Sequence, residues 1–200
     1  VRQGGAVVCA MLDQAREQPR DEAIARAGAG TNNVPVAKMS ERGVPVFNAP
    51  GANANAVKEL VIAGMLMGAR NLIPALRFAE GLQGTDAEIS KAVEAGKKNY
   101  AGVELPYRTL GIIGLGAIGS LVADAAIKLG MHVLGYDPDI TVEAAWRLPS
   151  TVRKATSVDE VVKQSDFITL HVPLVDSTRN LINAERLATM KPGAVLLNFA

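Results

Sequence analysis

The chain has 200 residues, 48% of them hydrophobic, and a formal net charge of +1 at pH 7, a balance typical of a globular protein. With no basic patch and only 4% aromatic residues, it lacks the charge and the stacking groups that binding to nucleic acid requires. Cys9 is the only cysteine, so no disulfide can form within the chain. No signal peptide is recognisable, and we expect a cytoplasmic protein. No cluster of Cys and His residues indicates a metal site.

Residues 1–52 alternate short apolar runs with glycine and proline turns, which predicts short strands at 23–27 and 45–48. Asn53 is a good N-cap for a helix that extends to about Ile73, where Pro74 bends or ends it. This helix is apolar nearly all round, so we expect it to be buried on more than one side. A further helix is predicted over 87–98.

From Thr109 onward, strand and helix patterns alternate. The predicted strands are 109–113, 132–136, 152–155, 167–172 and 194–198, and the predicted helices are 117–129, 158–163 and 184–189. The apolar stretch 110–127 carries four glycines and Asp124, so it is typical of a strand followed by an amphipathic helix and not of a membrane span. This alternation predicts an α/β fold with a doubly wound parallel sheet and helices on both faces.

The most informative motif is Gly114-Leu115-Gly116-Ala117-Ile118-Gly119, which lies between a strand and a helix. A second strand follows the helix and ends at Asp137. In a dinucleotide-binding unit the first glycine permits the turn, the second lets a pyrophosphate approach, and the third lets helix and strand pack closely. Backbone N–H groups of Ala117 and Ile118 would hold the phosphates, and Asp137 would accept hydrogen bonds from the adenosine ribose. The alternative is a glycine turn that serves only packing in another α/β protein.

Several runs of residues together form the pattern of a known family. They are 25–33, 45–53, 108–113 into the glycine turn, 165–167 with 171–174, 190–193 and 198–200. Together these runs resemble the D-isomer-specific 2-hydroxyacid dehydrogenases over residues 24–200, and most closely the members that act on 3-phosphoglycerate in serine biosynthesis. Residues 3–23 do not follow the family pattern.

The resemblance implies two lobes: a flavodoxin-like substrate lobe made from both chain ends, and a Rossmann lobe inserted between them. Residues 1–52 would then be a partial substrate-binding domain, and 53–200 an incomplete NAD-binding Rossmann domain truncated at its C-terminus. The family's catalytic Arg, Glu and His would all follow Ala200. We therefore expect a fragment without catalytic residues, inactive by itself, from an enzyme that moves a hydride between NAD and a D-2-hydroxy acid.

Two other classes share parts of this pattern. An NAD-sensing corepressor with the same fold stays an alternative, because fold alone does not separate it from an enzyme. A methyltransferase has a similar glycine turn and acid, but Gly119 and the 171–173 loop argue against it.

The resemblance also implies site residues. On the cofactor side they are Ala49, Val172, Pro173, Thr178, Phe199 and Ala200. On the substrate side, Arg2 matches a phosphate-binding arginine or is a solvated terminal residue. Ala29 and Gly30 match a carboxylate-binding loop or form a plain turn. Asn53 matches a substrate-contacting residue, serves as an N-cap, or does both.

Three further expectations concern single residues and assembly. His171 ends a strand at the cofactor crevice but matches a cofactor-loop position instead of a catalytic one. Asp166 is typical of a solvated acid. The apolar surface of the helix from Asn53 predicts a homodimer or a larger even assembly, because a large exposed apolar patch marks an interface.

Overall fold

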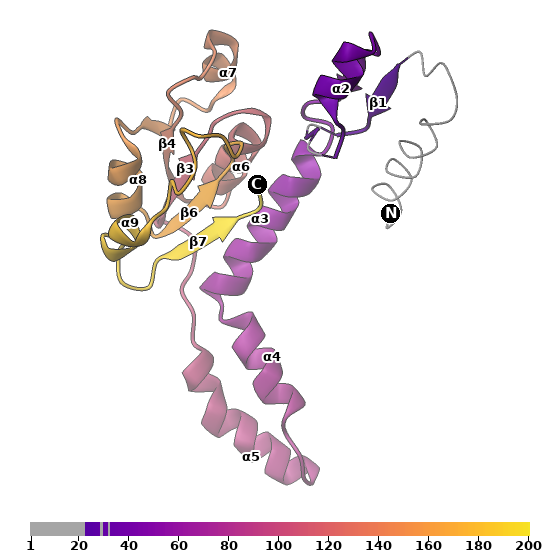
Figure 1. Ribbon diagram of the computed structural model, residues 1–200. Helices are drawn as coiled ribbons and strands as arrows, with labels where there is room; N and C mark the ends of the chain where they lie inside the picture. Colours follow the sequence, from indigo (N-terminus) through magenta and orange to yellow (C-terminus); the bar gives the residue numbers. More distant parts are fainter. Residues whose placement is uncertain (1–22, 29, 32) are drawn as a thin grey trace, which may run out of the picture. The chain divides into compact units, whose positions relative to one another are not determined.

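The computed structural model describes residues 23–200, except Ala29 and Asn32. The chain divides after Asn53 into two compact units, which are drawn in Figure 1. The division falls one residue beyond the boundary expected from the sequence. That the first unit belongs to a substrate-binding domain remains a prediction.

The first unit contains two short parallel strands. β1 (Ile24–Arg26) pairs with β2 (Val46–Asn48), and the helix α2 (Val36–Glu41) connects them. Both strands were expected from the sequence, whereas α2 was not. Its Met39 side chain is buried, and α2 contacts β2.

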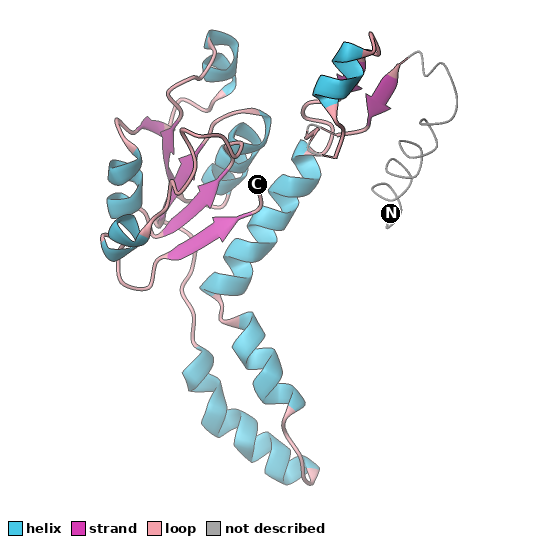
Figure 2. Cartoon of the chain, viewed as in Figure 1, coloured by secondary structure: helices cyan, strands magenta, loops and turns pink. Residues whose placement is uncertain are grey.

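The second unit holds a five-stranded parallel sheet in the order β5-β4-β3-β6-β7, drawn in magenta in Figure 2. The strands are β3 (Thr109–Ile113), β4 (His132–Tyr136), β5 (Arg153–Lys154), β6 (Phe167–Leu170) and β7 (Val195–Asn198). The chain leaves β3 first toward β4 and later returns to β6 on its other side. This order matches five strands of the Rossmann arrangement, and it confirms the predicted doubly wound fold.

Both faces of the sheet are covered by helices. On one face, Leu110 and Ile112 of β3 pack with α3 (Ala54–Ala69) and α6 (Ala117–Lys128). On the other face, Ile113 and Ile168 pack with α8 (Val158–Gln164), and α9 (Ala184–Ala188) contacts α8. Because a strand presents alternate side chains to opposite faces, a strand buried on both faces is largely apolar. β3 and β6 are apolar except for Thr109 and Thr169.

The helix predicted from Asn53 to Ile73 is two helices. α3 ends at Ala69, and α4 (Leu72–Glu80) leaves it at an angle of 66°. The break lies at Asn71, whose φ is 49°, and not at Pro74, as expected from the sequence. Pro74 lies in the first turn of α4, where its missing N–H costs no hydrogen bond. Among the described residues no single helix is long and apolar enough to cross a membrane, although the bent α3–α4 pair meets that test together.

α3 is buried along one face only. Val61 and Met65 are fully buried, whereas Leu60 is 51% exposed and Met67 45% exposed. The expectation that this helix is buried on more than one side is therefore wrong within a single chain. α4 and α5 (Asp86–Gly96) bury no residue at all, and Figure 1 shows them leading away from the sheet and back to it.

Tyr107, just before β3, has a φ of 65° and a side chain that is 85% exposed. This left-handed conformation costs a residue with a Cβ about 1 kcal/mol or more, and the exposed ring gains little by burial. We expect Tyr107→Gly to raise the free energy of unfolding by roughly 1 kcal/mol, measured by denaturant titration. Tyr107→Ala removes the ring but keeps the Cβ, so it should give no gain. Equal gains in both variants would contradict a backbone origin.

Candidate dinucleotide-binding site

The glycine turn lies where β3 meets α6, at the carboxyl end of the sheet. β3 has β4 on one side and β6 on the other, and the connections to these two strands run over opposite faces. A crevice opens at such a topological switch point, and open α/β sheets bind their ligands there. The turn that the sequence singled out is therefore placed where a nucleotide would bind.

Two of the three glycines are required by close contacts. Gly114 has a φ of 93°, and a Cβ on it would lie 2.5 Å from the carbonyl oxygen of His171. A Cβ on Gly119 would overlap the carbonyl oxygen of Gly114. These glycines thus let β3, β6 and α6 approach one another, as expected for the first and third positions of the motif.

Gly116 differs from the other two because the space beside it is open. A Cβ there would meet no atom within 4 Å, and both Gly116 and Ala117 are exposed. Gly116 caps α6 without any side-chain hydrogen bond, so the first N–H groups of the helix are left for another acceptor. This open cradle of helix N–H groups fits the pyrophosphate of a dinucleotide.

Asp137 connects the end of β4 with the glycine turn. Its Oδ2 accepts a hydrogen bond from the Leu115 N–H at 2.8 Å, and its Oδ1 accepts one from the Asp139 N–H at 3.1 Å. A carboxylate oxygen has a further lone pair, so Asp137 can still accept from ribose hydroxyls. The hydrogen bond to Leu115 was not foreseen from the sequence.

The loop after β6 supplies the other side of the crevice. Val172 is half-buried and Pro173 is exposed. The Thr178 hydroxyl accepts a hydrogen bond from the Val175 N–H at 2.9 Å and donates to the Pro173 carbonyl. Thr178 therefore closes the turn through its side chain, and a direct contact between Thr178 and the cofactor stays a prediction.

His171 lies between this loop and the glycine turn. Its Nε2 is 3.0 Å from the Thr169 hydroxyl, while its buried Nδ1 has no hydrogen-bond partner among the described residues. Burial lowers the pKa of His171 to about 4, so the imidazole is neutral at physiological pH. A group with this pKa is a poor general base near neutrality, and the expectation that His171 is not catalytic stays a prediction.

The remaining expected site residues are spread over both units. Phe199 packs its ring against α3, since a Cβ on Gly64 would lie 3.1 Å from it, and the Ala200 N–H donates to the Asn198 side chain. In the first unit, the Ala49 N–H donates to the Gly28 carbonyl, and Gly30 and Asn53 are exposed. Arg2 and Ala29 lie outside the described residues. The site roles expected for all of these residues stay predictions.

Asp166 is not the solvated acid that the sequence suggested. Its carboxylate accepts hydrogen bonds from the Thr109 N–H at 2.8 Å and from Lys191 at 3.2 Å. Burial opposes ionisation, but these two hydrogen bonds and the positive charges of Lys191 and Arg108 together outweigh it, so the pKa of Asp166 is below its ordinary value. Asp166 thus joins the amino ends of β3 and β6, at the edge of the sheet opposite the glycine turn.

The described residues include no group of three or more His, Cys, Asp or Glu side chains that could hold a metal ion. The arrangement at the glycine turn is that of a dinucleotide-binding domain. Its features are a cradle of N–H groups, an open position at Gly116, and an acid at the end of the neighbouring strand.

Comparison with known proteins narrows this class. Residues 72–200 match the family model of the D-isomer specific 2-hydroxyacid dehydrogenase, NAD binding domain. Over 200 residues the chain is 38% identical to D-3-phosphoglycerate dehydrogenase of Methanocaldococcus jannaschii, covering 100% of this chain and 35% of that protein. It is 40% identical to hydroxypyruvate reductase of Thermotoga maritima, covering 88% of this chain and 52% of the relative.

A solved structure agrees with these relatives. The TT0316 protein from Thermus thermophilus superposes with a TM-score of 0.75 at 30% identity, covering 95% of this chain and 55% of that one. The chain therefore belongs to the D-isomer specific 2-hydroxyacid dehydrogenase family, and it carries that family's NAD-binding domain, with NAD as the cofactor. It spans between about a third and about half of the length of these two curated relatives.

Proposed function

We propose that the protein transfers a hydride between NAD and a D-2-hydroxy acid, and that 3-phosphoglycerate is the substrate. The observation that carries NAD binding is the open N–H cradle at Gly116, with Asp137 at the end of the adjacent strand. The dehydrogenase reaction is supported by the match of residues 72–200 to the 2-hydroxyacid dehydrogenase family. The substrate assignment is supported by the relatives named phosphoglycerate dehydrogenase. A relative of similar sequence identity is named hydroxypyruvate reductase, and it favours a different substrate.

When bound, NAD supplies the hydride acceptor. The chain's own residues bind and orient it: N–H groups at the start of α6 hold the pyrophosphate, and Asp137 holds the ribose. We expect residues 1–200 alone to bind NAD without oxidising a 2-hydroxy acid. The only titratable imidazole beside the glycine turn, among the described residues, is His171, and burial has made it a weak base.

The substrate is tested by assaying the full-length protein for NADH production. With NAD saturating, kcat/KM for D-3-phosphoglycerate should exceed that for D-glycerate by about tenfold or more, because a bidentate contact to a phosphate contributes about that much. A higher kcat/KM for D-glycerate would instead assign the protein to the hydroxypyruvate reductase activity. No turnover of any D-2-hydroxy acid, with NAD still bound, would favour the corepressor-like alternative.

We also propose that the protein is a homodimer through the exposed apolar surface of α3 and α4. Leu66 and Met67 of α3 and Leu72, Ile73 and Leu76 of α4 are all at least 40% exposed. Burying the exposed half of each such side chain contributes on the order of 1 kcal/mol, so several on each of two chains would hold a dimer.

Charged variants test this interface. Leu66→Glu with Leu76→Glu should turn a dimer into monomers, measured by light scattering at micromolar concentration. Both residues are exposed, so the fold of the monomer should survive. Ile62 is a poorer position because it packs against the core. Val142→Glu, at a 70% exposed position on α7 (Val142–Arg147), is the matched control and should remain dimeric. A monomeric unmutated protein would rule the interface out.

A further inference from the structure

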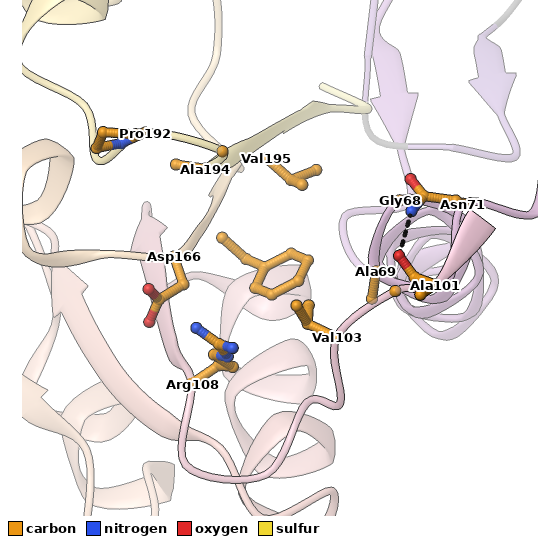
Figure 3. A pocket seen from close by; sticks show the side chains of 13 residues that line it. Gly68, Ala69, Asn71, Ala101, Val103, Arg108, Asp166, Pro192, Ala194 and Val195 are labelled. Atoms are coloured by element: carbon orange, nitrogen blue, oxygen red, sulfur yellow. Dashed lines mark hydrogen bonds between the residues drawn. The ribbon is translucent and has the colours of Figure 1, made fainter. Parts of the chain in front are cut away.

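A cavity of about 290 Å³ lies at the amino ends of β3, β6 and β7, at the edge of the sheet opposite the glycine turn. One wall comes from the end of α3 and from residues 101–103. The other comes from the starts of the strands and from the turn at 192–194. Figure 3 shows Arg108 and Asp166 on one side, and Asn71 with Ala101 on the other. Nothing in the proposed dehydrogenase function uses this cavity.

Among the described residues, the charges lining the cavity leave the guanidinium of Arg108 without a hydrogen bond or an ion pair. Asp166 already accepts hydrogen bonds from Thr109 and Lys191. The guanidinium of Arg108 lies near enough to Asp166 to favour its ionised form, but it makes no hydrogen bond or ion pair within 4 Å to the part of the chain that the structure describes. Two cations therefore face one carboxylate, and the guanidinium fork of Arg108 remains available to an anion.

Two backbone donors add to this site. The N–H groups of Gly102 and Gly193 donate to none of the residues described in the structure, and both glycines line the cavity. The wall at Gly102 is held in place, because Val103 N–H donates to the Ala69 carbonyl at 2.7 Å and Asn71 donates to the Ala101 carbonyl at 3.0 Å. A Cβ on Gly102 would overlap the Ala69 carbonyl oxygen, so only glycine fits here.

The rest of the lining is apolar. Phe167 is 2% exposed and Ala69 is 3% exposed, and Val103 and Val195 lie beside them. Inorganic phosphate has no apolar part that could contact this lining. A carboxylate with a short aliphatic chain would contact both the apolar lining and the polar groups of the cavity. The volume is at the lower end of small-molecule sites, which hold roughly 300 Å³ or more, so the ligand must be small.

We propose that this cavity binds a small aliphatic carboxylate, with Arg108 as the residue that receives the carboxylate group. Arginine matches a carboxylate with two parallel N–H donors, and Gly102 and Gly193 line the same cavity. The site is separate from the cofactor site, because it lies at the amino ends of strands whose carboxyl ends carry the glycine turn.

Calorimetry on the full-length protein tests the proposal, with isobutyrate as the probe. Isobutyrate should bind at millimolar concentration and its uncharged analogue isobutyramide should not. Arg108→Gln should weaken isobutyrate binding about tenfold or more, because a hydrogen bond to a charged group is lost. Arg147→Gln, at an exposed position on α7, removes an equal charge far from the cavity and should leave binding unchanged.

Ala101→Leu provides a second variant, since it fills the cavity from the opposite wall and keeps Arg108. It should also abolish isobutyrate binding while NAD binds as before. Isobutyrate binding that is unaffected by Arg108→Gln would place the carboxylate elsewhere, such as at the substrate loop, and overturn the proposal. Phosphate binding as tightly as isobutyrate would overturn the ligand class. No binding of either anion would overturn the site itself, whatever the outcome of the dehydrogenase assay.

Discussion

Asp137→Ala should weaken NAD binding by roughly ten- to a hundredfold, because it removes hydrogen bonds to a charged group. Two kinds of bond are lost together. The ribose loses its acceptor, and the Leu115 N–H loses the carboxylate that holds it at 2.8 Å. NADP should respond in the opposite sense, since the carboxylate that repels a 2′-phosphate is gone. The gap between NAD and NADP affinity should therefore narrow, as measured by calorimetry on the full-length protein.

Asp139→Ala is the matched control for this measurement. Asp139 is exposed and lies two residues further along, and only its backbone N–H takes part, donating to Asp137. The control variant removes the same charge from the same loop and keeps that N–H. NAD affinity should therefore stay within about threefold, the effect of an exposed surface charge. Equal losses in both variants would mean that general electrostatics, and not the contact made by Asp137, governs NAD binding.

The core of the Rossmann unit could be predicted from the sequence because its apolar patterns are strong. The strands expected at 109–113 and 132–136 are found with those bounds. β6 ends at Leu170, two residues before the expected end. Its neighbour β3 ends at Ile113, so no residue of β3 remains to pair with the residues after Leu170. The six-residue helix α7 was missed because it is too short to show a period. Thr141, whose side chain accepts from the Ala144 N–H, was the available signal.

Contacts between distant residues were the part that sequence could not supply. Asp137 was expected beside the ribose, but its hydrogen bond to Leu115 depends on the register of β3 and β4. That register pairs Ile113 with Tyr136 and so sets the residues that follow them side by side. The break at Asn71 was misplaced for a related reason. Proline in a first helical turn is tolerated, so Pro74 gave no reliable boundary, while the left-handed conformation of Asn71 leaves little trace in sequence.

Gly116→Ala should weaken NAD binding without harming the fold. Its φ of −69° lies outside the left-handed region that favours glycine, and the new methyl group would meet no atom within 4 Å. The free energy of unfolding should change by less than about 1 kcal/mol, with a slight gain because alanine restricts the unfolded chain. The methyl group would instead occupy the space through which a pyrophosphate approaches the helix N–H groups. Overpacking of this kind costs about 1–3 kcal/mol, which weakens NAD binding roughly five- to 150-fold.

Gly119→Ala is the contrasting variant, because it should lower the stability of the fold. Its methyl group would overlap the Gly114 carbonyl oxygen, so α6 must shift away from β3 at a cost of about 1–3 kcal/mol in unfolding free energy. Denaturant titration and NAD calorimetry on both variants should therefore separate them: Gly116→Ala loses cofactor affinity at unchanged stability, whereas Gly119→Ala loses stability. If Gly116→Ala bound NAD as tightly as the unmutated protein, the open space at Gly116 would not be the place of the pyrophosphate.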